Sequence, residues 1–397
     1  MEDLSLLNFI LTNKKLHLLC LVILLSSFFS LHFPSPAFAA DVDNSVLKRL
    51  SNLESRWGHL QLGGDFSLQA DYKRRSIERY ETPDFKSNLN LYLDAQIDRN
   101  FYFYLLLSHY DNYGYLNQLF INEAAVRYRS PRLLADLGKF KFTLDPLGLI
   151  ADHSSSPIQG IALQTGNTNI YLGGFYSRLY LKSKLITEDS VTVTSDDKFG
   201  LRIAFPKPGY MLGTTLIHTP TGVLSETAAS IDLITNLFGG TLQSELAWYQ
   251  PGAENYLENK GQGALGGLFT WNKAIADTIY TLNAWYFEKG FAPTSSILND
   301  SYLEKGNIFI NNSYGVGSTI QRKFSENWDA SISTGLLVSP GQIKYQGPQL
   351  TLSTRLRKSF SAVSSLQFGY DSVFEADVDK ITLARYNRFS IQLNTVF

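Results

Sequence analysis

Arginine residues recur at every second position in two separate segments of the sequence. Arg127 and Arg129 have this spacing in one segment, and Arg355 and Arg357 have it in another. Residues two apart in an extended chain lie on the same face, so each pair holds two guanidinium groups side by side. Guanidinium groups bind carboxylates and phosphates in a fixed geometry. The four arginines are therefore expected to form a basic wall.

Acidic side chains are the expected counterpart of this basic wall. Asp94, Glu123 and Asp145 are the predicted counter-charges, and Arg202 and Glu245 complete the predicted set of pore-lining or constriction residues. Arginines that face acids across a constriction order water and sort solutes by charge and dipole. In the alternative interpretation, the arginines and acids only pair across neighbouring strands and stiffen the wall.

Histidine and serine residues suggest an enzymatic alternative at 153–156, where the sequence reads His-Ser-Ser-Ser. A nucleophile and its base must meet across space with a third group that orients them, which adjacent residues rarely achieve. A solvated loop is the expectation there, and no catalytic residue is predicted. His59, His109 and His218 have no metal-ligand spacing, so neither a metal nor a cofactor is predicted.

From His59 onward, polar and apolar residues alternate in short segments, which is the pattern of strands with one polar and one apolar face. Residues 86–98 show it most clearly, with polar side chains at even positions and apolar ones at the odd positions from Leu89 to Ile97. The predicted strands are 59–71, 86–98, 100–110, 118–130, 132–141, 157–165, 168–178, 196–206, 209–218, 224–235, 239–249, 261–272, 274–290, 308–324, 327–339, 348–359, 361–372 and 384–397.

The connections between these segments alternate in length. Short ones, such as Arg99 and Lys273, are followed by long ones, such as 72–85 and 291–307. This alternation is typical of an all-β, antiparallel, up-and-down transmembrane barrel. Eighteen strands are predicted, or sixteen if one weak hairpin does not form. The polar face must line the lumen, because Arg or Lys facing lipid at mid-bilayer costs about 2–4 kcal/mol.

One predicted strand departs from this alternation. Residues 101–107 are apolar on both faces. Their inward side is expected to pack against a loop, a neighbouring subunit or an apolar ligand.

The first 39 residues have the features of a secretory signal peptide. Lys14 and Lys15 precede an apolar run, and Ala37-Phe38-Ala39 is a small-residue cleavage pattern. Cys20 is the only cysteine and lies in this segment, so no disulfide is expected in the mature chain. The predicted organisation is a signal peptide at 1–39, a helix or linker at 40–58 and a barrel at 59–397.

Residues 40–58 contain a short apolar stripe. Val46, Leu50, Leu53 and Trp57 recur at helical spacing over about three turns. A helix this short is not stable alone. It is expected in the periplasm, where it packs into the barrel mouth, trimerises or serves as a linker.

Composition supports a membrane barrel and argues against a nucleic-acid partner. Lys and Arg number 35 against 36 Asp and Glu, so the chain has no basic field for nucleic acid. Aromatic residues make up 13%, with 22 Tyr and 26 Phe, which fits the aromatic girdles of lipid-facing barrels.

The last nine residues place Phe389, Ile391, Leu393 and Phe397 on one face of a strand that ends the chain. This ending resembles that of bacterial outer-membrane barrels. The resemblance implies export to the outer membrane and recognition of these four residues by the assembly machinery. It also implies contact with outer-membrane lipid and lipopolysaccharide. Thr395 departs from the family pattern, which often has an aromatic residue there.

Residues 120–148 resemble the strand-turn-strand segment of substrate-selective porins, especially the phosphate- and sugar-selective groups. The resemblance implies passive diffusion of small hydrophilic solutes or ions through a water-filled pore, and a homotrimer. It also implies that the third external loop, 142–156, folds inward and narrows the pore. Two alternatives stay open: an uptake channel for hydrophobic compounds, motivated by residues 101–107, and a barrel enzyme or envelope tether.

Overall fold

The structure is a computed structural model that describes residues 59–75, 84–112, 119–154, 157–184, 191–220, 225–252, 263–294, 296–298, 309–339, 348–377 and 380–397. The predicted signal peptide and the predicted helix at 40–58 lie outside the described residues. Among the described residues, no helix is long and apolar enough to cross a membrane.

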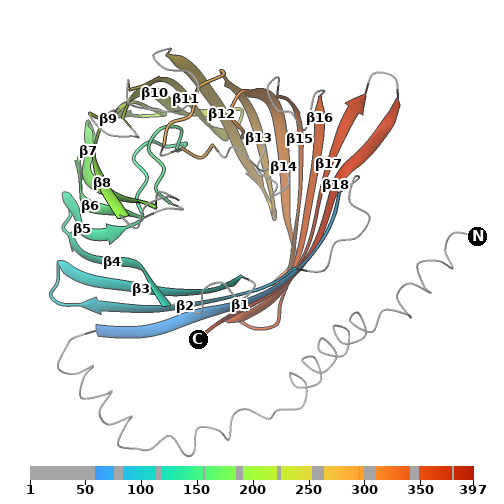
Figure 1. The fold of residues 1–397 in the computed structure, drawn as a ribbon, viewed down its shortest axis with the longest axis horizontal. Coiled ribbons are helices and arrows are strands. Elements are labelled where there is room, and N and C mark those ends of the chain that lie inside the picture. The colour runs from blue at the N-terminus through green and yellow to red at the C-terminus, as the bar shows by residue number, and fades with distance from the viewer. Residues whose placement is uncertain are drawn as a thin grey trace, which may run out of the picture. The chain divides into compact units, whose positions relative to one another are not determined.

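Eighteen strands form one antiparallel sheet that closes on itself (Figure 1). Each strand pairs with the next along the chain, and β18 pairs with β1. The prediction of an eighteen-stranded up-and-down barrel is therefore confirmed. The strands are β1 His59–Arg75, β2 Asp84–Gln96, β3 Phe101–Asn112, β4 Leu119–Arg129, β5 Leu133–Phe140, β6 Ile158–Gly166, β7 Tyr171–Lys184, β8 Val191–Lys207, β9 Tyr210–Thr219, β10 Glu226–Leu237, β11 Gly240–Pro251, β12 Ala264–Ile275, β13 Thr278–Phe287, β14 Ser313–Ser325, β15 Trp328–Val338, β16 Gln349–Ser359, β17 Ser364–Asp377 and β18 Lys380–Val396.

Tight turns join the strands at one end of the barrel. The turn between β8 and β9 contains Gly209, with φ +89°, and the turn between β10 and β11 contains Gly239, with φ +71°. These values lie in the left-handed region that glycine adopts without steric cost. Two-residue turns of this kind fix the register of the strands they join.

The outer face of the sheet is apolar and the inner face is polar, which is the reverse of the arrangement in a soluble protein. Leu246 on β11 is 60% exposed, whereas its neighbour Glu245 is 0% exposed. Large apolar side chains project outward from every part of the sheet, among them Ile231, Phe269, Val316, Leu336 and Phe389. An apolar exterior around a polar interior is the pattern of a barrel that spans a lipid bilayer.

The seam between β1 and β18 involves the last residue of the chain. Phe397 N donates to Gly64 O, and Gly64 N donates to Phe397 O, both at 2.9 Å. A Cβ on Gly64 would meet the Phe397 ring at 2.6 Å, so only glycine accommodates the ring there. Phe389 and Leu393 pair with Tyr72 and Leu68 along the same seam. The predicted assembly residues therefore lie where the barrel closes.

The structure of β3 changes the interpretation of residues 101–107, which the sequence predicts to be apolar on both faces. Its Tyr102 and Tyr104 line a recess together with polar residues such as Gln61 and Asp94. The two tyrosines lie on the inner face of the barrel, and the Tyr102 hydroxyl donates to Arg99 O at 3.3 Å. The inward face of β3 is therefore amphipathic at these two positions.

Candidate functional site

Two groups of inward-facing charged residues on the barrel wall differ in their exposure to solvent. We call the first group, on β16, β17, β18, β1 and β2, the open wall; it contains Arg355, Asp371, Arg388, Asp71 and Lys86. We call the second group, on β8, β10 and β11, the packed wall; it contains Lys198, Arg202, Glu226, Asp232 and Glu245.

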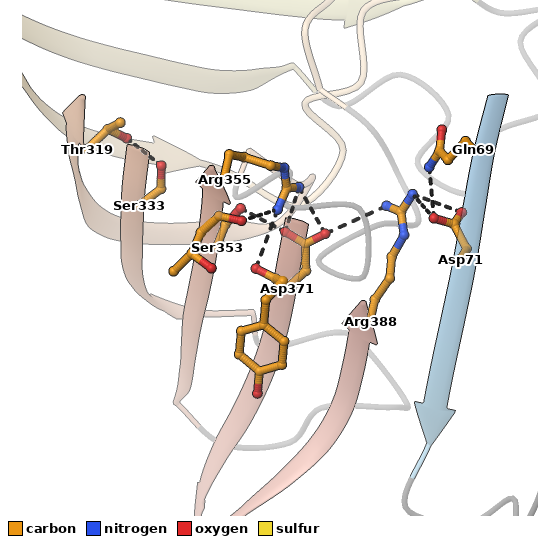
Figure 2. Close-up of polar contacts among 10 residues, drawn as sticks. Gln69, Asp71, Thr319, Ser333, Ser353, Arg355, Asp371 and Arg388 are labelled. Carbon is orange, nitrogen blue, oxygen red and sulfur yellow. Dashed lines mark hydrogen bonds and ion pairs between the residues drawn. The ribbon is translucent and has the colours of Figure 1, made fainter. Parts of the chain in front are cut away.

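Charges alternate in sign across the open wall (Figure 2). Arg388 Nη2 donates to both oxygens of Asp71 at 3.0 Å, and its Nη1 lies 3.7 Å from Asp371 Oδ2. On the far side of Asp371, Arg355 Nη2 donates to Oδ2 at 2.9 Å. Lys86 Nζ completes the row at 3.6 Å from Asp71 Oδ2. Five neighbouring strands are thereby linked through their side chains.

Cations and acids of the open wall differ in their exposure. The side chains of Lys86, Arg355 and Arg388 are 14–30% exposed, whereas those of Asp71 and Asp371 are 0–3% exposed. The carboxylates lie against the wall, and the cationic groups cover them on the side of the lumen. Lys86 Nζ also lies 3.4 Å from Asp84 Oδ2, so three cations stand against three carboxylates. The positive charge that a solute meets comes from the two arginines that cover Asp71 and Asp371.

Ion pairs of the packed wall exclude solvent. Arg202 donates to Asp232 through two parallel bonds of 2.5 and 2.9 Å, and also to Thr215 Oγ1 at 3.1 Å. Lys198 Nζ donates to Glu226 Oε1 at 2.6 Å. Bidentate arginine–carboxylate pairs are among the strongest in proteins, and buried ones must satisfy each other. These pairs brace the wall rather than face solutes.

The connection from β5 to β6 covers the packed wall. We call its described residues 141–154 loop 3, and Figure 1 shows them inside the ring of strands. Leu149 and Ile150 are fully buried in one apolar cluster with wall residues such as Tyr249 and Leu268. Leu147 N donates to Glu245 Oε2 at 3.4 Å, which ties the loop to β11.

A second connection, from β13 to β14, packs against loop 3. Ile297 N donates to Gly148 O at 2.9 Å. Thr294 Oγ1 accepts from Lys198 Nζ at 2.7 Å, and Thr294 N donates to Glu226 Oε2 at 3.0 Å. The β13–β14 connection is thus anchored to buried charges of β8 and β10, and loop 3 to Glu245 of β11.

Asp145 anchors the turn of loop 3. Its carboxylate accepts from Ile150 N at 2.8 Å and from Ala151 N at 3.1 Å. Burial raises the pKa of Asp145, while hydrogen bonds from Glu245 and from the loop backbone act in the opposite direction. Two adjoining buried carboxyl groups cannot both ionise without strong repulsion, so the Asp145–Glu245 contact favours a shared proton.

His153 also lies in loop 3 and is buried. Its ring contacts Phe175 edge-on at 5.4 Å between ring centroids, and Nε2 has no hydrogen-bond partner. Burial, together with the nearby charge of Lys198, lowers the pKa of His153 to about 3. The ring is therefore neutral near pH 7 and packs as an apolar group. Ser155 and Ser156 lie outside the described residues.

Solved structures of similar fold come from Pseudomonas aeruginosa. OccK3 (OpdO) matches with a TM-score of 0.59 at 10% identity, covering 88% of this chain and 98% of that one. OccK11 (OpdR) gives 0.57 at 10% identity, with 85% and 96% covered. OpdK, an outer membrane protein, gives 0.55 at 11% identity, with 85% and 99% covered. The chain has the fold of a bacterial outer-membrane porin. No protein-family model and no curated protein sequence matches it.

Within this porin fold, the four arginines of the predicted basic wall do not lie together. Arg127 and Arg129 are on β4, whereas Arg355 and Arg357 are on β16, with β17, β18, β1, β2 and β3 between them. Strand order around the barrel, which the spacing of arginines in sequence does not reveal, separates the two pairs.

The counter-charges also differ from the prediction. Arg127 pairs with Asp136, Arg355 with Asp371 and Arg357 with Asp329, each on a neighbouring strand. Of the predicted acids, Glu123 lies 3.5 Å from Lys141, and Asp145 and Glu245 adjoin each other. The alternative interpretation, in which inward arginines and acids pair across neighbouring strands, describes these arginines.

Asp71, Glu226 and Thr294 were not among the predicted site residues. Asp71 lies an even number of residues from Asp65 and Ser67, on the same polar face of β1. The alternation of the strand could therefore have predicted that Asp71 points inward. Thr294 lies in a long connection, where no periodicity indicates direction. Its contact with Glu226, 68 residues away, depends on the fold alone.

Proposed function

We propose that the barrel is an outer-membrane channel through which small hydrophilic solutes and ions diffuse passively. The porin fold, the apolar exterior and the charged inner wall support this proposal. We place loop 3 as the element that narrows the pore, because its apolar residues cover the packed wall. The solute path then runs along the open wall.

The observation that carries a preference for anions is the difference in exposure on the open wall. Arg355 and Arg388 face the lumen, and the carboxylates of Asp371 and Asp71 lie buried behind them. Charge of one sign lining a narrow path raises the local concentration of the opposite ion. Exposed guanidinium groups bind small carboxylates through two parallel hydrogen bonds. Vanillate, a carboxylate found with OpdK, is a suitable test solute.

Planar-bilayer recording tests the proposal. The purified protein is expected to conduct, and the reversal potential under a KCl gradient is expected to show preference for chloride. Lys86→Gln and Arg355→Gln should each reduce that preference, because each removes an exposed cation of the open wall. Lys358→Gln is the matched control, since Lys358 lies over the Trp328 ring on the outer face. Absence of conductance, or preference for potassium, would refute the proposal.

Two partners follow from the exterior of the barrel. The apolar outer face is the proposed contact surface for outer-membrane lipid and lipopolysaccharide. The closing strand, with Phe389, Ile391, Leu393 and Phe397, is the proposed recognition element for the assembly machinery. A homotrimer stays a prediction, tested by the mass of the detergent-solubilised protein.

A further inference from the structure

A recess of about 180 Å³ lies on the inner wall near the short-turn end of β1 to β4. Asp94, Tyr102, Tyr104 and Arg129 are among its lining residues. The register places Asp94 opposite Tyr104, and Tyr102 opposite Arg127 on its other side. An acid on β2 and arginines on β4 therefore flank the two tyrosines of β3. This volume accommodates several waters or one small solute.

Arg129 differs from the other inward-facing arginines of the described chain. Arg127, Arg202, Arg355, Arg357 and Arg388 each pair with an aspartate. Arg129 has no carboxylate partner among the described residues. Its guanidinium lies over the Tyr102 ring, 5.5 Å from the centroid.

Asp94 is the acidic counterpart of Arg129 in the recess. It makes no hydrogen bond or ion pair with any residue that the structure describes. Its charge acts on the nearby Tyr104 hydroxyl across the β2–β3 pairing. One recess thus holds a cation and an anion that the described protein leaves without counter-ions. In other parts of the described wall, oppositely charged groups such as Arg202 and Asp232, or Arg355 and Asp371, neutralise each other.

We propose that this recess is a binding subsite for a small zwitterion that carries one ammonium and one carboxylate group, such as a free amino acid. Arg129 binds the carboxylate, and Asp94 binds the ammonium group. The rings of Tyr102 and Tyr104 hold the carbon skeleton between the two charges. This inference rests on the proposed channel, because the solute reaches the recess through the lumen.

The charge pattern distinguishes a zwitterion from a simple ion. Asp94 repels a carboxylate that has no ammonium group, and Arg129 repels an amine that has no carboxylate. A zwitterion satisfies both unpaired charges at once. Arg127 is held by two bonds to Asp136, so Arg129 is the arginine that can turn toward a solute. The short-turn end of such barrels faces the periplasm, so the subsite lies near the solute exit.

Titration calorimetry of the full barrel in detergent, with L-leucine and two analogues that each lack one charged group, tests the inference. Leucine is expected to bind at least tenfold more tightly than 4-methylpentanoate or 3-methylbutylamine. Arg129→Gln should weaken leucine binding about tenfold, the equivalent of one charged contact. Asp94→Asn should weaken leucine binding similarly, yet leave binding of 4-methylpentanoate unchanged or tighter.

Arg322→Gln is the matched control, because the Arg322 guanidinium also lies 5.5 Å from a ring centroid, that of Phe324, on the outer face. It should leave leucine binding unchanged. Equal affinity for leucine and 4-methylpentanoate, or no effect of Arg129→Gln, would overturn the subsite. Conductance of the same protein in bilayers tests the channel separately: an open channel without leucine binding refutes the subsite alone.

Discussion

The packed wall and the open wall are built from the same kind of residue pair. Arg202 and Asp232 on the packed wall, and Arg357 and Asp329 beside the open wall, are each an inward arginine with an inward aspartate. Their side chains are 3% and 0% exposed in the first pair but 50% and 23% exposed in the second. The exposures differ because loop 3 and the β13–β14 connection pack over the region of Arg202 and Asp232.

This difference sets what each pair can do. A buried pair contributes rigidity, and the loss of one partner leaves a charge without solvent or counter-ion. An exposed pair contributes little to stability, because water screens it, but its cation remains available to a passing solute. Structural support and solute contact are therefore separate tasks on two parts of one wall.

The largest loss of stability is predicted for a substitution that removes an ion pair of the packed wall. Arg202→Ala should lower the free energy of unfolding by about 3–5 kcal/mol, because Asp232 stays buried without a partner. Arg357→Ala should lower it by at most about 1 kcal/mol, because that pair is solvated. Urea-induced unfolding in liposomes, followed by tryptophan fluorescence, measures both. Equal losses in the two variants would show that cover by the inward loops does not set how much such a pair contributes to stability.

A second prediction concerns the anchor of loop 3. Asp145→Ala removes the acceptor for Ile150 N and Ala151 N, and each buried amide left unpaired costs about 1–3 kcal/mol. Loop 3 should then detach from the packed wall and become sensitive to protease in liposomes. Thr143→Ala is the control, because its hydroxyl bonds only the exposed rim of the loop. Unchanged protease resistance of the Asp145 variant would contradict the anchoring role.

The pKa of Asp145 gives this anchor a pH dependence. When loop 3 is docked, the pKa of Asp145 is raised above its ordinary value of 3.8. As the pH rises, Asp145 therefore loses its proton at a lower pH in the released loop than in the docked loop. Docking should therefore weaken as pH rises from 3.8 through the raised value, and Asp145→Asn should remove this part of the dependence. Protease sensitivity of loop 3 across pH, compared between wild type and variant, is the measurement. Parallel profiles would count against the raised pKa.

His153 should impose the opposite dependence. The pKa of His153 is about 3 in the docked loop and 6.5 ordinarily. Between these values, His153 is protonated in the released loop and neutral in the docked loop. Docking of loop 3 should weaken as pH falls from 6.5 toward 3. His153→Phe should abolish this contribution to the pH dependence. The two groups oppose each other in the wild type, so each effect is read as a difference from its variant.

The smallest effect on stability is predicted at the seam, which lies within the open wall. Phe397→Ala removes a ring that is mostly exposed to lipid, so the folded barrel should lose little stability. Folding should suffer more, because the ring and backbone of Phe397 meet Gly64 where the sheet closes. The fraction of heat-modifiable barrel in outer membranes measures this. Phe360→Ala, an exposed aromatic in a short turn, is the control and should assemble normally.

Sequence alone determined the strands and the direction of their side chains. The alternation of polar and apolar residues is local, since neighbouring residues in a strand point to opposite faces. Segments such as 348–359 and 327–339 therefore match β16 and β15 to within one residue at each end. The alternation of short and long connections fixed the antiparallel order in the same way.

Tertiary structure decided which charges meet and which remain unpaired. Arg388 and Asp71 are 317 residues apart and bond only because the barrel closes between β18 and β1. Arg202 is buried, and Arg129 has no acidic partner among the described residues, because of strand register and inward loops rather than local pattern. Electrostatic partners depend on distance in space, and period-two alternation fixes only the face on which each charge lies.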